Sequence, residues 1–297
     1  MDEEMFDRTV VRLRRDRAAG TVVRVREILD EVADRLVDRL DDTTRRFERA
    51  LDLGGRGAVA PKLRGRGIEV VSADLSARMA ARAGGRAVAA DEEWLPFAAA
   101  SFDLVVANLS LHWVNDLPGA LVQLRAALKP DGLLLASVPV LPTLAPLRTA
   151  LAEAEAVLSG GVAPRVSPFP TLQDCAALLQ RAGFALPVAD GETVALRYAD
   201  PADIVRDLRA AGEASALRLR ERRGAPAMLV PAALAGLDAD PSDGRVPMTL
   251  HLAMLTGWAP APTQPKPLPR GSATMRLEDA LRELPDGTGD GEPRDGE

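Results

Sequence analysis

The chain has few residues of the kinds that bind metals or form cross-links. It contains one cysteine, Cys175, and two histidines, His112 and His251. A disulfide within the chain is therefore excluded, as is a zinc or iron–sulfur site built on several thiolates. An iron site with two histidines and one carboxylate would need both histidines. We expect no bound metal, a buried and inert Cys175, and a His251 that packs in the core.

Aromatic residues are also scarce, at 3% of 297 residues, so Leu, Val and Ala must fill the core. The net charge is −6, whereas a nucleic-acid-binding chain needs a basic face. We find no apolar run of about 18 residues, the length that spans a membrane, and no signal-peptide core at the N-terminus. We therefore expect no nucleic-acid partner, no integral membrane segment and a cytoplasmic location.

Strand and helix patterns alternate in the first half of the chain. Residues 1–20 form a charged lead-in, and the Arg-rich segment 6–26 reads as an exposed helix, whereas apolar residues at helical spacing predict a helix over 21–41. The next predicted elements are strands over 49–53, 68–73, 86–90, 102–107 and 133–138, and helices over 58–65 and 117–128. Strands that alternate with helices indicate a parallel sheet.

The second half is richer in helices. The predicted helices lie over 143–158, 172–181, 201–222 and 226–236, and the predicted strands over 192–198 and 248–257. The tail from Pro260 is rich in Pro and Gly, and we expect it to be partly disordered.

A glycine-rich segment follows the first strand and reads Leu-Asp-Leu-Gly-Gly-Arg-Gly over 51–57. It does not spell the G-x-G-x-x-G fingerprint of dinucleotide sites. Asp52 precedes Gly54, Gly55 and Gly57, and its charge would repel a phosphate but suits a cationic ligand. A glycine-rich turn that binds no ligand is the alternative.

Acidic residues end the next two strands. Asp74 comes about twenty residues after the glycines, where a carboxylate can accept both hydroxyls of a ribose. Asp91 follows the third strand and could accept the amino group of an adenine. The alternative for Asp74 is that it caps the next helix through Ser76. The alternative for Asp91 is a solvated position in a loop. The fourth strand ends at Asn108, at the sheet edge where ligands bind in such folds.

These segments together resemble the class I S-adenosylmethionine-dependent methyltransferases, and Lys129-Pro-Asp-Gly132 agrees with that family. The resemblance implies that S-adenosylmethionine is the cofactor. The glycine loop would hold its methionine part, the second acid its ribose and the third acid its adenine. The residues implied to bind the cofactor are Asp52, Gly54, Gly55, Gly57, Asp74, Leu75, Asp91, Glu92, Asn108, Leu109 and Trp113.

A narrower resemblance is to the mitochondrial complex I assembly factors of methyltransferase fold. It is carried by the stretches 6–8, 90–97, 109–118, 167–169, 257–258 and 270–274, and covers about residues 5–280. The malonyl-carrier-protein methyltransferases of biotin synthesis are similar more distantly, through the core and Thr249 to His251.

The resemblance implies an α/β fold, a Rossmann-like seven-stranded, mostly parallel sheet with helices on both faces. An N-terminal helix and helical insertions in the C-terminal half are added to it. The implied organisation is a helical lead-in over 1–45, a methyltransferase-like domain over 46–258 and a tail over 259–297. Within the domain, we expect a core over 48–140 and substrate-side helices over 141–245.

His112 follows the fourth strand and is the candidate catalytic residue, as a base or as a group that orients the acceptor. A packing role is the alternative. Residues proposed to line the acceptor site are Phe6, Arg8, Arg165, Phe169 and Arg197. The glycine loop departs from the family pattern, because it is one residue shorter or carries Arg56 in place of a glycine. Arg56 should weaken binding of a cationic cofactor unless its side chain points to solvent.

Three functions follow from this reading. The first is methyl transfer to a protein or to a group on an acyl-carrier protein. The second is assembly of respiratory complex I, with one of its subunits as partner, by an arginine hydroxylase on the same fold. The third is a non-catalytic module that binds S-adenosylmethionine.

Overall fold

The computed structural model describes residues 4–219 and 226–264. Residues 1–261 form one compact unit. Most of the expected tail, and the stretch 270–274 that carried part of the resemblance, lie outside the described residues. Within the described ranges, no helix has both the length and the apolar character needed to cross a membrane.

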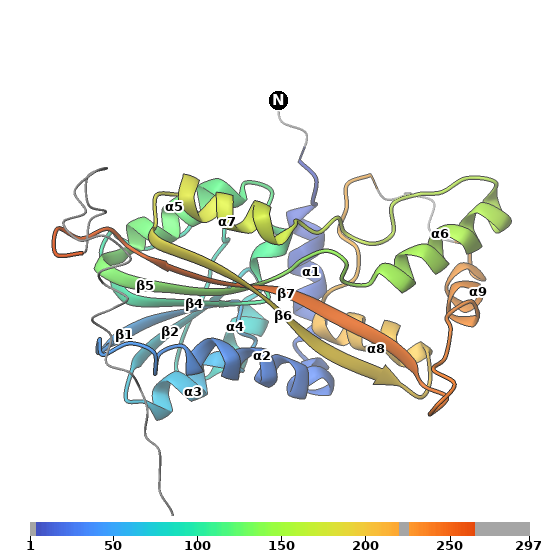
Figure 1. The fold of residues 1–297 in the computed structure, drawn as a ribbon, viewed down its shortest axis with the longest axis horizontal. Coiled ribbons are helices and arrows are strands. Elements are labelled where there is room, and N and C mark those ends of the chain that lie inside the picture. The colour runs from blue at the N-terminus through green and yellow to red at the C-terminus, as the bar shows by residue number, and fades with distance from the viewer. Residues whose placement is uncertain (1–3, 220–225, 265–297) are drawn as a thin grey trace, which may run out of the picture. The chain divides into compact units, whose positions relative to one another are not determined.

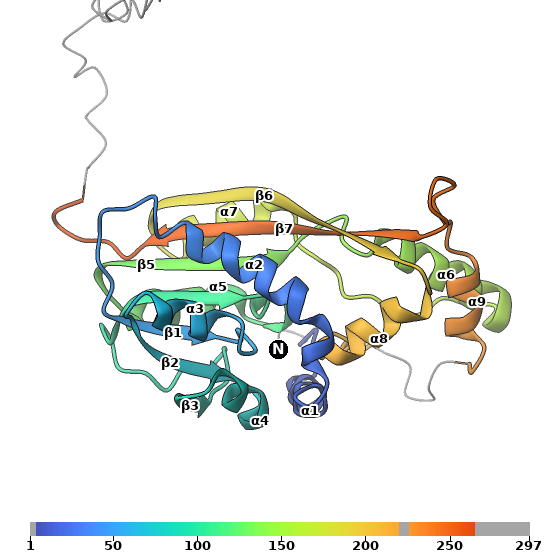
Figure 2. The same cartoon turned by 90° about the horizontal axis from the view of Figure 1, so that it is seen from below.

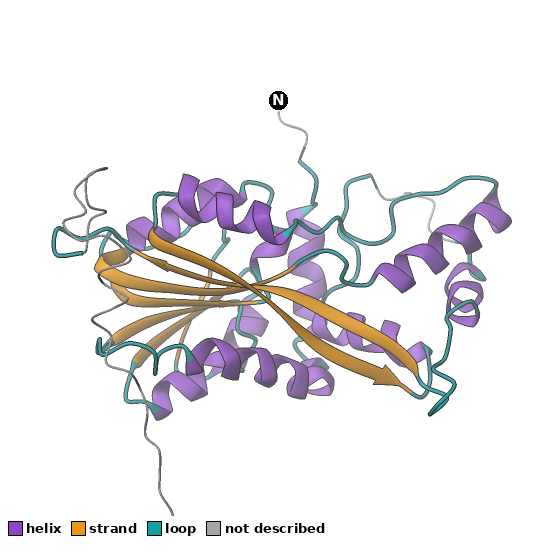
Figure 3. Cartoon of the chain, in the orientation of Figure 1, coloured by secondary structure: helices purple, strands orange, loops and turns teal. Residues whose placement is uncertain are grey.

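The described residues form a seven-stranded sheet in the order β3-β2-β1-β4-β5-β7-β6 (Figures 1 and 3). The first five strands are parallel, and β7 runs antiparallel to both β5 and β6. The predicted mostly parallel sheet is therefore confirmed. The strands are β1 Arg49–Leu53, β2 Glu69–Asp74, β3 Arg86–Ala89, β4 Phe102–Asn108, β5 Leu128–Pro139, β6 Ala185–Tyr198 and β7 Val246–Trp258.

Helices cover both faces of the sheet, as predicted. On one face, Leu36 of α2 and Leu63 of α3 pack with Leu104 of β4. On the other, Leu124 of α5 packs with Val105 of the same strand. Neighbouring residues of β4 thus serve opposite faces, because side chains alternate along a strand. The helices are α1 Arg8–Ala18, α2 Arg26–Asp38, α3 Val59–Gly65, α4 Ala77–Ala80, α5 Leu117–Ala127, α6 Ala145–Ser159, α7 Leu172–Arg181, α8 Ala202–Ala211 and α9 Leu229–Ala235.

Strands β6 and β7 continue past the rest of the sheet as a two-stranded ribbon. Residues 252–258 of β7 pair with β5, whereas its earlier residues, from Val246, pair with β6 alone. Helices α6, α8 and α9 lie beside this extension (Figures 1 and 2). Leu147 of α6 and Ile204 of α8 are buried there with Val246 and Met248 of β7. The ribbon therefore supports the region where substrate-side helices were expected.

Two of the predicted helices differ from the structure. The expected helix over 201–222 ends at Ala211, because Gly212 adopts the left-handed conformation with φ 80°. Its last residues, 220–222, lie outside the described ranges. The lead-in does contain a helix, α1, but the expectation that it is exposed was wrong. Arg15 of α1 is 1% exposed and Val11 is equally buried, because α1 packs over the edge of the sheet.

Candidate functional site

The loop after β1 depends on glycine at two positions. Gly54 has φ 66°, and a side chain there would overlap Ser110. Gly57 has φ 83°, in the same left-handed region. The loop therefore lies directly against the segment that follows β4, which brings the first and fourth predicted site segments together.

Asp52 is buried at the end of β1 with little to compensate its charge. Its Oδ2 accepts a hydrogen bond from Ser72 Oγ at 3.1 Å. Its Oδ1 lies against Gly55 and accepts no hydrogen bond of ordinary geometry from the described residues. Burial raises the pKa of Asp52 to about 7, and the charge of Asp74 adds to that rise. A cationic ligand would supply the missing partner.

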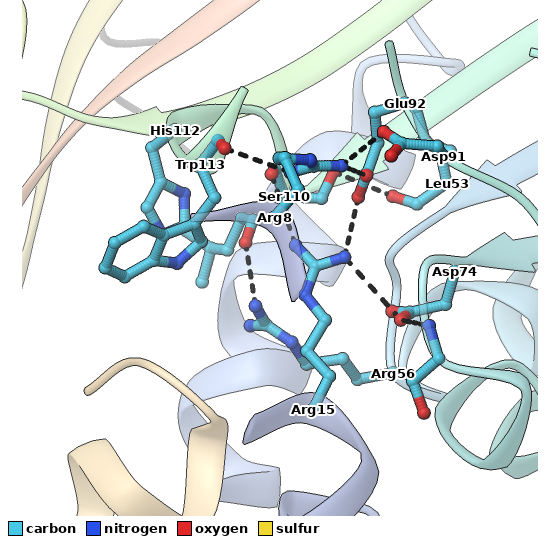
Figure 4. Close-up of polar contacts among 12 residues, drawn as sticks. Arg8, Arg15, Leu53, Arg56, Asp74, Asp91, Glu92, Ser110, His112 and Trp113 are labelled. Carbon is cyan, nitrogen blue, oxygen red and sulfur yellow. Dashed lines mark hydrogen bonds and ion pairs between the residues drawn. The ribbon is translucent and has the colours of Figure 1, made fainter. Parts of the chain in front are cut away.

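Asp74 and Glu92 share one arginine from α1. Arg15 Nη1 lies 2.6 Å from Glu92 Oε1 and 3.5 Å from Asp74 Oδ1 (Figure 4). All three residues are buried. Asp74 Oδ1 also accepts a hydrogen bond from the Ser76 amide at 2.8 Å. Its Oδ2 is buried and finds no hydrogen-bond partner in the part of the chain that the structure describes.

The two carboxyl groups respond differently to this environment. Burial raises the pKa of Asp74, and the Arg15 charge offsets that only in part. Burial also acts against ionised Glu92, but the charges of Arg15 and Arg8 outweigh it and lower the Glu92 pKa to about 2. Arg15 is therefore mainly the partner of Glu92, and Asp74 keeps an unsatisfied acceptor.

Arg8, also on α1, joins the network beside Asp91. Its Nη2 lies 2.6 Å from Asp91 Oδ1 and contacts Glu92, and its Nη1 donates to the Trp113 carbonyl at 2.9 Å (Figure 4). The Asp91 side chain is 28% exposed. Asp91, the predicted adenine ligand, thus shares its carboxylate with Arg8. Leu75 is half-buried and packs against the cluster that contains Trp113.

Asn108 ends β4 with its side chain fully engaged inside the fold. Its Oδ1 accepts from Ser137 Oγ at 3.0 Å, and its Nδ2 donates to the Leu29 carbonyl at 3.1 Å. Leu109 follows with φ 52°, which turns the chain toward the glycine loop. The Asn108 side chain thus holds the end of β4 in place rather than presenting free hydrogen-bonding atoms.

Glu213 joins three residues that come from two of the predicted site segments. Its Oε2 lies 2.7 Å from His112 Nε2 and 2.6 Å from Trp113 Nε1, and its Oε1 contacts Arg56 Nη2. Burial acts to raise the pKa of Glu213, but the charges of His112 and Arg56 outweigh it, so the pKa lies well below its ordinary value. Glu213 is therefore a carboxylate that accepts these contacts.

Arg56 does not point to solvent. It is 4% exposed, and its Nη2 donates to the Leu109 carbonyl at 3.0 Å as well as contacting Glu213. Its charge is therefore paired within the protein. The condition that we set from the sequence, a solvent-facing Arg56, is not met, but Glu213 removes much of the repulsion that an unpaired Arg56 would exert.

A cavity of about 430 Å³ lies between α6, α8, α9 and the ribbon. Its inner end is lined by Arg56, Leu109, His112 and Trp113, which are residues of the predicted cofactor site or next to it. The cavity and the glycine loop therefore meet at His112, the arrangement that group transfer between two bound molecules needs.

The proposed acceptor residues fall in three places. Arg165 and Phe169 line the cavity. Phe6 packs edge-on against Trp113 with ring centroids 5.2 Å apart, and Arg8 belongs to the α1 network. Arg197 lies elsewhere: it is exposed and forms ion pairs with two aspartates of the segment before β7. The prediction that Arg197 lines the acceptor site was wrong, because β6 carries the Arg197 side chain to the outer surface of the ribbon.

The sequence reasoning missed Arg15 and Glu213. Arg15 is one of many arginines in a segment that looked exposed, so its sequence position carries no signal. Glu213 lay inside the predicted helix over 201–222, but Gly212 before it is a typical helix stop. That signal could have placed Glu213 in a turn after α8 rather than on a helix. Cys175 is buried, and burial raises its pKa to about 11, as expected of an inert thiol.

The residues present fit S-adenosylmethionine, which carries an ammonium group and ribose hydroxyls. Within the described ranges, Asp74 Oδ2 has no donor, and Asp52 Oδ1 has only the Gly55 amide nearby, without full hydrogen-bond geometry; Gly55 also places no side chain over Asp52 Oδ1. One feature opposes the fit: the Arg15 guanidinium lies between Asp74 and Glu92. A ribose must share these carboxylates with Arg15 or displace it. The assignment of individual cofactor ligands stays a prediction.

The chain matches the family model described as a methyltransferase domain over residues 25–187. It is 36% identical to the mitochondrial arginine-hydroxylase NDUFAF5 of Danio rerio, over 93% of this chain and 89% of that protein. The human protein of the same name is 37% identical, over 91% of this chain and 81% of its own length. The malonyl-(acyl-carrier protein) O-methyltransferase of Halorhodospira halophila is 36% identical, over 86% of this chain and 90% of that protein.

A solved structure supports the fold. The YcgJ protein of Bacillus subtilis superposes with a TM-score of 0.52 at 16% identity, covering 76% of this chain and 98% of that one. The resemblances to the class I methyltransferases, to the complex I assembly factors and to the malonyl-carrier-protein methyltransferases are thus confirmed. The family model and the relatives show that this chain belongs to the methyltransferase-domain family, with the class I methyltransferase fold.

Proposed function

We propose that the chain transfers a methyl group from S-adenosylmethionine to an oxygen of an acceptor bound in the cavity between α6, α8 and α9. The observation that carries this proposal is the position of His112. It lies where the predicted cofactor loop and the cavity meet, and it is hydrogen-bonded to Glu213. When bound, S-adenosylmethionine supplies a methyl group on a positively charged sulfur; a carbon–oxygen bond forms, the carbon–sulfur bond breaks, and its electron pair stays on sulfur.

In this proposal, His112 removes the acceptor's proton. Glu213 is ionised, so His112 Nε2 carries the hydrogen of their shared bond, and Nδ1 is the basic nitrogen. Nδ1 is buried and has no hydrogen-bond partner among residues 4–219 and 226–264. We assign the proton of the acceptor hydroxyl to His112. Glu213 fixes the ring and stabilises the imidazolium that forms, and Asp52 and Asp74 hold the cofactor's ammonium group and ribose.

The test is transfer of label from methyl-labelled S-adenosylmethionine to components of a cell extract by the full chain. We expect His112→Gln to lower the transfer rate about 10²- to 10⁴-fold, the range of general-base catalysis, and to leave cofactor affinity unchanged. The matched control is His251→Gln, at the other histidine, which is half-buried on β7 and does not line the cavity. Label transfer that is equal in the two variants would remove His112 from the chemistry.

A second candidate rests on the relatives named arginine-hydroxylase, which match more than nine-tenths of this chain. It assigns the same cavity to an arginine side chain, in a reaction that inserts an oxygen atom into a C–H bond instead of adding a methyl group, and that needs an external oxidant such as molecular oxygen together with a reductant. Mass spectrometry of the modified acceptor distinguishes the two, because the mass gained is that of an oxygen atom or of a methylene group. Binding of the cofactor without any modification would favour the non-catalytic module.

Partners and location follow from the same relatives. A carrier-bound acceptor agrees with the malonyl-(acyl-carrier protein) O-methyltransferases, and a complex I subunit agrees with the assembly role expected from the sequence. The cytoplasmic location stays a prediction, since the names of the arginine-hydroxylase relatives place those proteins in mitochondria. Loss of complex I after deletion of the gene would favour a complex I subunit as the partner. A requirement for biotin would favour an acyl-carrier protein.

A further inference from the structure

The cavity beside the ribbon has walls made mostly of aliphatic side chains. Leu147 and Leu151 of α6, Leu208 of α8 and Ala233 of α9 face one another across it, with Leu196 of β6 at its side. A volume of about 430 Å³ is in the range of pockets that enclose a small organic molecule or one long side chain. The walls provide apolar contact, so the polar groups at the lining decide which ligands are accepted.

The anionic groups at the lining already have cationic partners. Glu213 is paired with Arg56 and hydrogen-bonded to His112. Asp207 lies 2.6 Å from Arg24 Nε. A guanidinium or ammonium group entering the cavity would have to displace one of these partners while losing its own water, which costs several kcal/mol when it is not compensated. The cavity is therefore poorly suited to a cationic acceptor.

The cationic groups are likewise engaged or in water. Arg165 hydrogen-bonds to both carboxylate oxygens of Glu155, and Arg14 donates to the Ser215 carbonyl. Arg209 is exposed, so an anion bound there stays largely in solvent. A free carboxylate, such as that of a malonyl group, finds the lining arginines already committed. The balance of charge thus disfavours an anionic acceptor as well.

The inner end of the cavity is aromatic around its one basic nitrogen. The His112 ring centroid lies 5.4 Å from that of Trp113 and 6.5 Å from that of Phe169. Such edges and faces favour another ring. Imidazole removes a proton more readily from a phenol or enol, whose pKa lies near 10 like that of tyrosine, than from an aliphatic alcohol.

On the basis of the proposed function, we infer that the acceptor is an uncharged apolar molecule or acyl group whose phenol or enol hydroxyl lies next to His112. Its ring stands against Phe169 and Trp113, and its apolar remainder fills the space between α6, α8 and α9. The proton of the hydroxyl goes to His112 as the oxygen takes the methyl group and the carbon–sulfur bond of the donor breaks. This class differs from the arginine and malonyl acceptors in the names of the relatives.

The test measures binding of 4-pentylphenol to the full chain by calorimetry, without cofactor. N-acetylarginine amide and malonate serve as cationic and anionic comparators. We expect the phenol to bind at least about tenfold more tightly than either comparator. Leu151→Trp, which fills the cavity, should weaken phenol binding by about tenfold or more. Leu158→Trp is the matched control, because Leu158 lies on the same helix but is exposed and outside the lining, and it should have no effect.

The readouts separate this inference from the proposed function. Affinity for S-adenosylmethionine should be equal in Leu151→Trp and the unmodified chain. Phenol binding without any cofactor binding would overturn methyl transfer and leave the cavity assignment standing. Comparators that bind as tightly as the phenol, or a phenol affinity unchanged by Leu151→Trp, would overturn the inference about the acceptor. If Leu151→Trp does not fold, Leu208→Phe takes its place, because it adds less side-chain volume to the same cavity.

Discussion

The two regions that meet at His112 treat charge in opposite ways. Beneath α1, Arg8 and Arg15 are held against Asp74, Asp91 and Glu92, and most of these charges are buried. In the cavity beside the ribbon, aliphatic side chains form the walls, and Arg56 and Arg165 of the lining are paired with Glu213 and Glu155. The first region can exchange one cation for another, whereas the second gains by excluding water from an apolar guest. A methyl transfer from a charged donor to an apolar acceptor needs both.

The largest expected effect is a loss of stability when Arg15, which pairs with the buried carboxylates beneath α1, is removed. Among the described residues, Arg15→Ala leaves Glu92, which is fully buried, with Arg8 as its remaining ion-pair partner, and it removes the ion-pair partner of Asp74. Loss of one partner from a buried ion pair costs roughly 3–5 kcal/mol of unfolding free energy. We expect a loss in that range, measured by urea unfolding at neutral pH.

Arg12 provides the matched control for this prediction. It lies on the same helix, and its ion pair with Asp16, at 3.4 Å, is largely exposed. Arg12→Ala should change stability by less than about 1 kcal/mol, the usual worth of an exposed pair. Equal losses in the two variants would show that water reaches the α1 network and that its charges are not buried as a unit.

Removal of Asp74 should affect ligand binding more selectively. Asp74→Ala deletes an acceptor atom that has no donor among the residues the structure describes, and so should weaken S-adenosylmethionine binding roughly tenfold or more. This corresponds to hydrogen bonds to a charged group worth about 1.5–3 kcal/mol. Calorimetry measures the affinity, and 4-pentylphenol binding in the cavity should not change. Unchanged cofactor affinity would contradict the assignment of Asp74 to the ribose.

Asp190→Ala is the control for that measurement. Asp190 lies on β6, where its ion pair with Arg39 is half exposed and far along the sheet from β2. It should leave cofactor affinity as it is. A similar loss in both variants would indicate a general effect of lowering the negative charge of the chain, rather than a local contact.

The charged region was largely predictable from the sequence, and the cavity was not. Asp52, Asp74 and Asp91 follow strand patterns, and parallel strands bring their carboxyl ends to one edge, so position along the chain implied proximity in space. Arg15 and Glu213 reach the site from elements that are distant in sequence and whose packing depends on tertiary contacts. The apolar walls come from four elements whose leucines look like ordinary core residues, so nothing in the sequence distinguishes a lined cavity from a filled core.

A further expected effect is a pH dependence of cofactor binding through Asp52. Its pKa, raised by burial to about 7, means that the free protein binds a proton there below neutral pH. The raised pKa also makes the fold lose stability as pH rises from about 4 to 7, since the unfolded chain releases that proton more easily. A bound ammonium group favours the carboxylate, so binding should release the proton.

Affinity should therefore fall as pH drops from 7 to 5, by at most about tenfold per unit, or about 1.4 kcal/mol. Calorimetry between pH 5 and 7, where the ligand's own amino group stays protonated, measures both the affinity and, from buffers of different ionisation enthalpy, the proton released. Asp52→Asn should bind more weakly and lose the proton release. A pH-independent affinity in the unmodified chain would mean that the ammonium group binds away from Asp52, and that charge in the first region is compensated by the α1 arginines alone.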